Sequence, residues 1–132
     1  MNIVILSGIQ AAGKSTLYAN RFADSHKLLS LDALRSRLEE HRVMTELIEL
    51  REPFVVDNTN PTPEVRAKYI TAAKAAGYRV IGYQIEVPVR IAIARNRQRG
   101  GTIPDAAIWA TAKKMLPLSY EEGFDEIIRI AE

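Results

Sequence analysis

The chain has 132 residues, of which 47% are hydrophobic and 26% are charged, and its formal net charge is +2. The length and composition fit one globular domain over residues 1–132, and the small net charge does not by itself indicate nucleic-acid binding. The absence of cysteine excludes disulfides, thiolate metal sites and cysteine nucleophiles.

No apolar stretch approaches the roughly 18 residues of a membrane-spanning helix. The sequence also starts with a core strand, which leaves no room for a signal segment, so we expect a cytoplasmic protein without a membrane partner. The two histidines, His26 and His41, lack further ligands at metal-binding spacing, and we expect both to be exposed helix residues. The sequence indicates no oligomeric state.

The first predicted element is an apolar strand over residues 2–7 that would be buried on both faces. The next residues, GIQAAGKST at 8–16, match the phosphate-binding pattern G-x-x-x-x-G-K-[ST] between a strand and a helix. Backbone N–H groups of such a loop and of the following helix N-terminus point at one anion. The pattern therefore predicts a nucleoside triphosphate site made of Gly8, Ala11, Ala12, Gly13, Lys14, Ser15 and Thr16.

Two residues of this loop have expected chemical roles. Lys14 would reach the β- and γ-phosphates as a catalytic residue, and the Ser15 hydroxyl would bind Mg²⁺. The alternatives are a glycine-rich turn without a ligand and a degenerate loop that has lost catalysis.

A helix over residues 14–25 and a short strand over 27–31 lead to Asp32, which would cap a polar helix ending near residue 52. Asp32 and Arg35 are three residues apart and would share a helix face. Near a phosphate loop, Asp32 is a candidate general base for an attacking hydroxyl, and Arg35 is a candidate ligand for an anionic group on the acceptor. The alternative is a helix cap paired with an arginine.

Residues 54–57 read as the third strand, which ends in Asp57. A carboxylate at this position supports Mg²⁺ or its water shell. Asn58 and Asn60 add hydrogen-bonding groups, and we expect all three side chains to contribute to substrate binding. The alternative for this segment is an Asx turn that leads into a helix over residues 63–77.

The remaining predicted elements are a strand, two helices and a final strand, over residues 78–87, 88–99, 104–116 and 124–130. Between the two helices, Gly100 and Gly101 read as the hinge of a lid that closes over the triphosphate. The spacing of Arg95, Arg97 and Arg99 points them in different directions. Arg99 is the strongest candidate for a lid residue that neutralises developing charge, and Arg95 is the next candidate for nucleotide binding. A solvated arginine face is the alternative.

Strands and helices alternate along the chain, which predicts an α/β fold with a mostly parallel sheet covered on both faces. Ligands of such sheets bind at the carboxyl ends of the strands, so the phosphate loop, Asp32 and Asp57 are expected to be neighbours. Five aromatic residues lie in apolar contexts and are expected in the core: Phe54, Tyr69, Tyr78, Tyr83 and Trp109.

Four segments together resemble the kinase domain of polynucleotide 5′-hydroxyl kinases: residues 8–16, LDALR at 31–35, VVDNTNP at 55–61 and RNRQRG at 95–100. The D-N-T-N-P and R-N-x-x-R-G elements are much more specific than the phosphate loop. The resemblance implies a three-layer P-loop kinase fold with a parallel five-stranded sheet in the order 2-3-1-4-5. It also implies ATP and Mg²⁺ as cosubstrates and phosphate transfer to the 5′-hydroxyl of DNA or RNA.

The resemblance also assigns roles to single positions. Lys14 and Ser15 match the phosphate and metal contacts, and Asp32 matches the general base. Arg35 matches the arginine that binds the 3′-phosphate of the acceptor. Asp57 matches a required aspartate, and Arg99 matches the lid arginine. The segment between Arg35 and the third strand is shorter than in the phage enzyme, and no phosphatase domain accompanies the kinase motifs. Two alternatives therefore remain: a small-metabolite or antibiotic kinase of the same fold, and a nucleotide-binding module with slow or no turnover.

Overall fold

The computed structural model describes residues 1–31, 34 and 36–131. In this part of the chain, five strands form one parallel sheet in the order β2-β3-β1-β4-β5, which confirms the predicted α/β fold and strand order. The strands are β1 (Asn2–Ser7), β2 (Lys27–Leu29), β3 (Phe54–Asp57), β4 (Arg79–Glu86) and β5 (Glu126–Ala131).

Helices connect the strands, and none of those in the described residues is long and apolar enough to cross a membrane. They are α1 (Lys14–Arg21), α2 (Arg37–Glu49), α3 (Pro63–Ala75), α4 (Val89–Gln98), α5 (Asp105–Lys114) and the short 3-10 helix η1 (Tyr120–Glu122). The predicted elements are present, with ends that differ by a few residues. The two largest differences are the end of α1, at Arg21 instead of 25, and the start of α2, where Ser36 caps the helix by accepting a hydrogen bond from Glu39 N–H; the cap expected at Asp32 lies outside the described residues.

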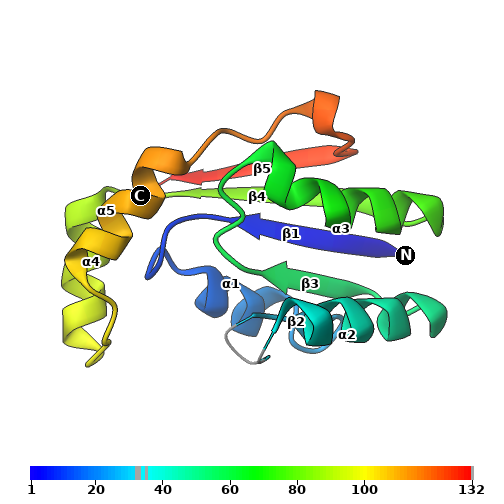
Figure 1. The fold of residues 1–132 in the computed structure, drawn as a ribbon, viewed down its shortest axis with the longest axis horizontal. Coiled ribbons are helices and arrows are strands. Elements are labelled where there is room, and N and C mark those ends of the chain that lie inside the picture. The colour runs from blue at the N-terminus through cyan, green and yellow to red at the C-terminus, as the bar shows by residue number, and fades with distance from the viewer. Residues whose placement is uncertain (32–33, 35, 132) are drawn as a thin grey trace.

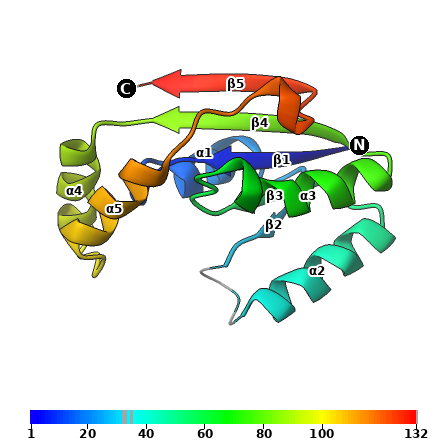
Figure 2. The same ribbon diagram turned by 45° about the horizontal axis from the view of Figure 1, so that its top comes forward.

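The sheet is covered on both faces, as the sequence predicted. Ile3 and Ile5 of β1 lie on the face covered by α2 and α3, where Tyr69 belongs to the same core cluster. Val4 and Leu6 point to the opposite face, which α1 covers. Figure 2 shows these three layers, with α2 and α3 on one side of the sheet and α1 on the other.

The carboxyl ends of the strands share one edge because every pairing is parallel. The arrowheads in Figure 1 point toward α4 and α5, which lie beyond that edge. A separate apolar cluster joins these two helices to the loop after β1 and includes Ile9, Ile85, Ala92 and Ile108. In the register, Leu6 pairs with Asp57 on β3, so the chain leaves β1 beside the end of β3.

Two predictions about single residues are wrong. Trp109 is 51% exposed, because α5 buries only one stripe, around Ile108, against its cluster. His26 lies in the turn before β2, half-buried, where its ring contacts Ser25 Oγ and Asn2 Oδ1. His41 is exposed on α2, as predicted, and the other four aromatic residues of the predicted core are buried: Phe54, Tyr69, Tyr78 and Tyr83.

Candidate active site

The loop between β1 and α1 has the backbone shape of an anion cradle. Ala11 and Gly13 have positive φ angles of 61° and 106°, and left-handed residues of this kind are typical of loops whose backbone N–H groups bind anions. Gly13 precedes α1 and has no side chain to cap it, so no side-chain cap occupies the helix N-terminus, the end of a helix that attracts anions. The start of the loop packs closely on β4, since a Cβ at Gly8 would lie 3.1 Å from Ile85 O.

Lys14 lies inside this cradle. Its side chain is almost buried, and Nζ donates hydrogen bonds to Gly8 O at 2.9 Å and Ile9 O at 2.7 Å. The ammonium charge is therefore fixed along the concave side of the loop, where the positive charge attracts a polyphosphate.

Ser15 and Asp57 meet at the end of the loop. The Ser15 hydroxyl donates a hydrogen bond to Asp57 Oδ2 at 2.9 Å, and Asp57 is only 8% exposed to solvent. A hydroxyl and a carboxylate are oxygen ligands of the kind that Mg²⁺ binds. The described residues contain no cluster of three or more acidic or histidine side chains.

Two clefts open on opposite sides of the phosphate loop. The larger, of about 660 Å³, is lined by α1, by α4 and by the ends of β4 and β5. Its lining beyond the loop consists of Leu17, Asn20, Arg21, Ile85, Arg95, Gln98, Arg99 and Ile130. Its size falls in the usual range for small-molecule sites, and apolar and polar groups are mixed in it as a nucleoside would require.

The smaller cleft, of about 300 Å³, lies on the side of β2 and β3. It is lined by Gln10, Lys14, Ser15, Leu31, Asp57, Asn58, Thr59, Arg99 and Ile103, together with loop residues that also line the larger cleft. The residues common to both clefts are Ala11, Gly13, Thr16 and Arg99. A group bound against the loop is therefore accessible from both sides.

The three arginines at the C-terminal end of α4, Arg95, Arg97 and the capping residue Arg99, have different surroundings. Arg99 borders both clefts, whereas Arg95 lines only the larger one. Arg97 is exposed and pairs with Asp105 at the start of α5. The divergent directions expected from their spacing are present, and Arg99 alone of the three reaches both clefts.

Asn58 and Asn60 differ in position, although only one residue separates them. Asn58 lines the smaller cleft, and its Oδ1 accepts a hydrogen bond from Leu31 N–H at 2.9 Å. Asn60 is 1% exposed, and its Nδ2 donates to Leu6 O at 2.7 Å. The Asn60 side chain thus connects the loop to β1 and does not face solvent, which departs from the substrate contact expected of it. The other two acceptor-side candidates, Asp32 and Arg35, lie outside the described residues.

A buried carboxylate that the sequence did not single out supports this side of the site. Glu40 is 2% exposed and accepts hydrogen bonds from Asn58 Nδ2, Tyr69 OH and Lys68 Nζ at 2.9–3.1 Å. Burial raises the pKa of Glu40, but the hydrogen bonds from Lys68 and Tyr69 and the Lys68 charge outweigh it, so the net pKa is lowered. Burial and the nearby carboxylate raise the pKa of Tyr69.

Sequence reasoning also missed the far wall of the larger cleft. Asn20 follows Thr16 by one helical turn, so a helical wheel of α1 would have indicated that both face the same ligand. Ile85 and Ile130 lie near the carboxyl ends of parallel strands, a position that would have indicated that they line a ligand site. Gln98 carried no signal of its own.

Comparisons with known proteins agree with this architecture. The family model described as AAA domain (AAA_33) matches residues 3–118. A curated relative, the "Bifunctional polynucleotide phosphatase/kinase" of Schizosaccharomyces pombe, is 29% identical over 89 residues, which are 67% of this chain and 20% of that protein. The chain thus spans about a fifth of the length of this relative.

Several solved structures have the same fold. A sugar kinase from Janibacter sp. HTCC2649 superposes with a TM-score of 0.73 at 15% identity, covering 99% of this chain and 85% of that one. Kti12 of Chaetomium thermophilum, in complex with ADP-AlF3, gives 0.68 at 17% identity, covering 98% and 88%. The PezAT toxin-antitoxin structure from Streptococcus pneumoniae gives 0.74 at 16% identity, covering 99% and 68%. At these identities the likeness concerns the fold, which is that of P-loop kinases.

Proposed function

We propose that this chain, which belongs to the AAA domain family AAA_33, is a kinase that transfers the γ-phosphate of ATP to a hydroxyl group of a second substrate. The observation that carries the proposal is the pair of clefts on either side of one phosphate loop, with Arg99 bordering both. A nucleotide in the larger cleft and an acceptor in the smaller one would meet at the loop, as in-line phosphoryl transfer requires.

The residues around the phosphate loop have separate roles in this proposal. The backbone N–H groups and Lys14 bind the phosphates, and Arg99 stabilises the charge that develops between the two clefts. Ser15 and Asp57 are the residues that would hold Mg²⁺, which neutralises the β- and γ-oxygens when bound.

The acceptor hydroxyl supplies the attacking oxygen. In the proposed step Asp32 accepts the hydroxyl proton, a bond forms from that oxygen to the γ-phosphorus, and the bond from the γ-phosphorus to the bridging oxygen of ADP breaks. Asp32 directly follows Leu31, and Leu31 lines the smaller cleft. This placement in the chain supports Asp32 as the general base.

For the acceptor we propose the 5′-hydroxyl of a DNA or RNA end. The D-N-T-N-P segment and the R-N-x-x-R-G segment support this choice, as does the 29% identity to a protein named for polynucleotide kinase activity. Arg35 would bind the 3′-phosphate of the terminal nucleotide, and Asp57 and Asn58, which line the smaller cleft, would contact the acceptor. Binding to such an acceptor would weaken as salt concentration rises, because cationic side chains that neutralise the acceptor phosphates release counterions into solution.

The test is transfer of labelled phosphate from ATP to 5′-hydroxyl oligonucleotides that carry or lack a 3′-phosphate. We expect Asp32→Ala to lower the rate by about 10²-fold or more, and Arg99→Ala to lower it by about 10³-fold. Arg97→Ala, which removes an exposed arginine two residues away, is the matched control and should retain activity. Full activity of the Asp32 variant would remove it as the base, and a wild type that binds ATP but phosphorylates no oligonucleotide would refute the acceptor.

A second candidate is a small metabolite as acceptor. The smaller cleft of about 300 Å³ is at the low end of ligand sites, and the cations lining it within the described residues are Lys14 and Arg99. A neutral sugar or nucleoside would fit such a cleft. A mass-spectrometric screen with ATP and mixed metabolites distinguishes the two, because a metabolite acceptor would be phosphorylated with no dependence on a 3′-phosphate.

A further inference from the structure

Asn96 is the buried residue among the exposed polar side chains at the end of α4. It is 2% exposed, whereas Arg97, Gln98 and Arg99 are all exposed. Its Nδ2 donates a hydrogen bond to Ile103 O at 2.8 Å, and its backbone O accepts one from Gly101 N–H at 2.7 Å. One asparagine therefore contacts both ends of the segment 101–103.

The two glycines fit this arrangement in different ways. Gly100 has a φ of +68°, a left-handed conformation that glycine adopts without strain. At Gly101 an added Cβ would lie 2.0 Å from Asn96 Oδ1 and 2.8 Å from Asn96 O, so the turn closes directly on the asparagine. The Gly-Gly pair, which the sequence favoured as a hinge, forms in this structure a turn built around Asn96.

The orientation of the Asn96 amide follows from these contacts. Only the NH₂ group can donate to Ile103 O, so Oδ1 must face Gly101. Oδ1 is buried and has no hydrogen-bond partner among the described residues. A buried acceptor without a partner is unfavourable, and such groups concentrate where the structure serves a function.

The turn carries two residues of the site. Arg99, at the C-terminal end of α4, borders both clefts, and Ile103 lines the smaller one. Asn96 is absent from the described residues that line either cleft. Whatever Asn96 contributes to the reaction, it contributes through the residues that the turn places.

We propose that Asn96 is a positioning residue that fixes Arg99 at the boundary between the nucleotide and acceptor clefts. The inference rests on the proposed kinase function. Arginine has a long side chain with many rotamers, and a defined backbone at its base reduces the entropy lost when its guanidinium meets the transferring phosphate. The donor in this arrangement is the Asn96 amide, and Asp or Leu at position 96 would lack it while preserving the approximate size.

The experiment is a double-mutant cycle on γ-phosphate transfer, measured to 5′-hydroxyl oligonucleotides and, in parallel, to water as ATP hydrolysis. The variants are Asn96→Leu and Asn96→Asp, each alone and combined with Arg99→Ala. We expect each Asn96 variant to lower kcat by about 10²-fold, the size of a misplacement near 1 Å. In the Arg99→Ala background the same substitutions should cause little further loss, because the residue they position is gone.

Two further variants and an unfolding measurement separate positioning from folding. Gly101→Ala should reproduce the kcat loss of the Asn96 variants, because its Cβ displaces the asparagine. Arg97→Ala should leave kcat unchanged, and thermal unfolding with ATP present shows whether each variant is folded and binds nucleotide.

The outcomes distinguish the inference from the proposed function. Additive losses in the Arg99→Ala background would overturn the positioning role and leave the kinase proposal intact. Wild-type activity of Arg99→Ala itself would remove Arg99 from the reaction and refute both its role and that of Asn96. Hydrolysis without oligonucleotide transfer would refute only the acceptor, since the cycle is still read from hydrolysis.

Discussion

The Ser15 hydroxyl and the Asp57 carboxylate lie 2.9 Å apart, although 42 residues separate them in the chain. The parallel pairing of β1 and β3 sets this distance, because Asp57 pairs with Leu6 just before the phosphate loop. In the proposed function both oxygens would serve Mg²⁺, and the carboxylate is the charged member of the pair. The metal requirement is therefore the property most closely tied to Asp57.

We predict that Asp57→Asn raises the Mg²⁺ concentration needed for half-maximal activity by about 10-fold or more, because the carboxylate charge that attracts and orients the metal shell is lost. ATP affinity in the absence of Mg²⁺ should change little. The measurement is a Mg²⁺ titration of phosphate transfer at fixed ATP. Asp105→Asn, on α5 and absent from the described linings of both clefts, is the matched control. An unchanged Mg²⁺ requirement would count against Asp57 as a metal-side residue.

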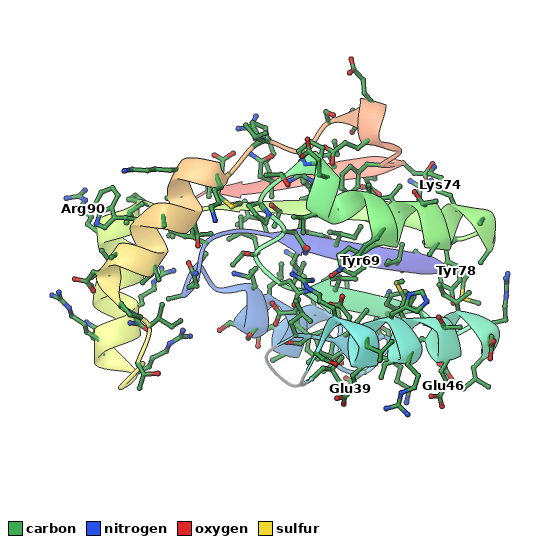
Figure 3. All side chains as sticks on the ribbon, in the orientation of Figure 1. Glu39, Glu46, Tyr69, Lys74, Tyr78 and Arg90 are labelled. Atoms are coloured by element: carbon green, nitrogen blue, oxygen red, sulfur yellow. The ribbon has the colours of Figure 1, made fainter. Side chains whose placement is uncertain are left out.

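At the scale of elements, α2, α3 and the loop after β3 meet at one buried carboxylate. Tyr69 points from α3 into the space between α3 and α2 (Figure 3), and its hydroxyl donates to Glu40 Oε2 at 2.9 Å. The Asn58 side chain donates through Nδ2 to the same oxygen, and its amide oxygen, Oδ1, accepts a hydrogen bond from Leu31 N–H. An ionised carboxylate accepts and never donates, so Glu40 determines the orientation of the Asn58 amide.

This network makes a prediction about pH. The pKa of Glu40 is lowered in the folded protein from its usual 4.5, so its ionisation stabilises the fold fully above that value. The stabilisation is lost as pH falls below 4.5 through the lower folded pKa. Glu40→Gln should unfold about 1–3 kcal/mol more easily at neutral pH, because Tyr69 and Asn58 lose a charged acceptor.

The measurement is chemical denaturation of both proteins over a pH series, and the stability of Glu40→Gln should fall less steeply with acid than that of the wild type. Glu46→Gln is the control, since Glu46 is exposed on α2 and points away from the sheet (Figure 3). Parallel pH curves for wild type and Glu40→Gln would show that folding does not lower the pKa of Glu40.

At the scale of the whole molecule, Arg66 links three distant segments. Its guanidinium is fully buried and donates to the Glu122 carboxylate of η1 at 2.7 and 3.0 Å. It also donates to Asn60 O after β3 and to the carbonyls of Leu116 and Pro117 after α5. The α4–α5 pair, which lies beyond the strand ends in Figure 1, is thereby attached to the loop beside the smaller cleft.

We predict that Arg66→Met destabilises the fold by about 3–5 kcal/mol, because it removes the cation paired with the Glu122 carboxylate and the donor to the carbonyls of Leu116 and Pro117. Arg79→Met breaks a largely exposed ion pair with Glu126 and should cost about 0–1 kcal/mol. Denaturant unfolding of both variants measures the difference. Equal losses would mean that the buried arginine contributes no more than a surface pair.

Much of the fold was predictable because its signals are local. The apolar run of β1, the glycine-lysine pattern of the loop and the proline at the start of α3 each lie within a few consecutive residues. The element ends were less predictable, as α2 shows: Ser36 competes with earlier residues as the cap, and only the packed helix decides between them.

The sequence by itself determined the phosphate loop, the alternation of strands and helices, and the placement of the loop and Asp57 at one sheet edge. Only the tertiary structure decided that Asn60 is buried, that Trp109 is exposed, and that Arg99, unlike Arg95, borders both clefts. It also revealed Glu40, whose partners Asn58 and Tyr69 lie 18 and 29 residues away. The physical reason is that a loop conformation follows from neighbouring residues, whereas the burial of a polar side chain depends on distant segments that pack around it.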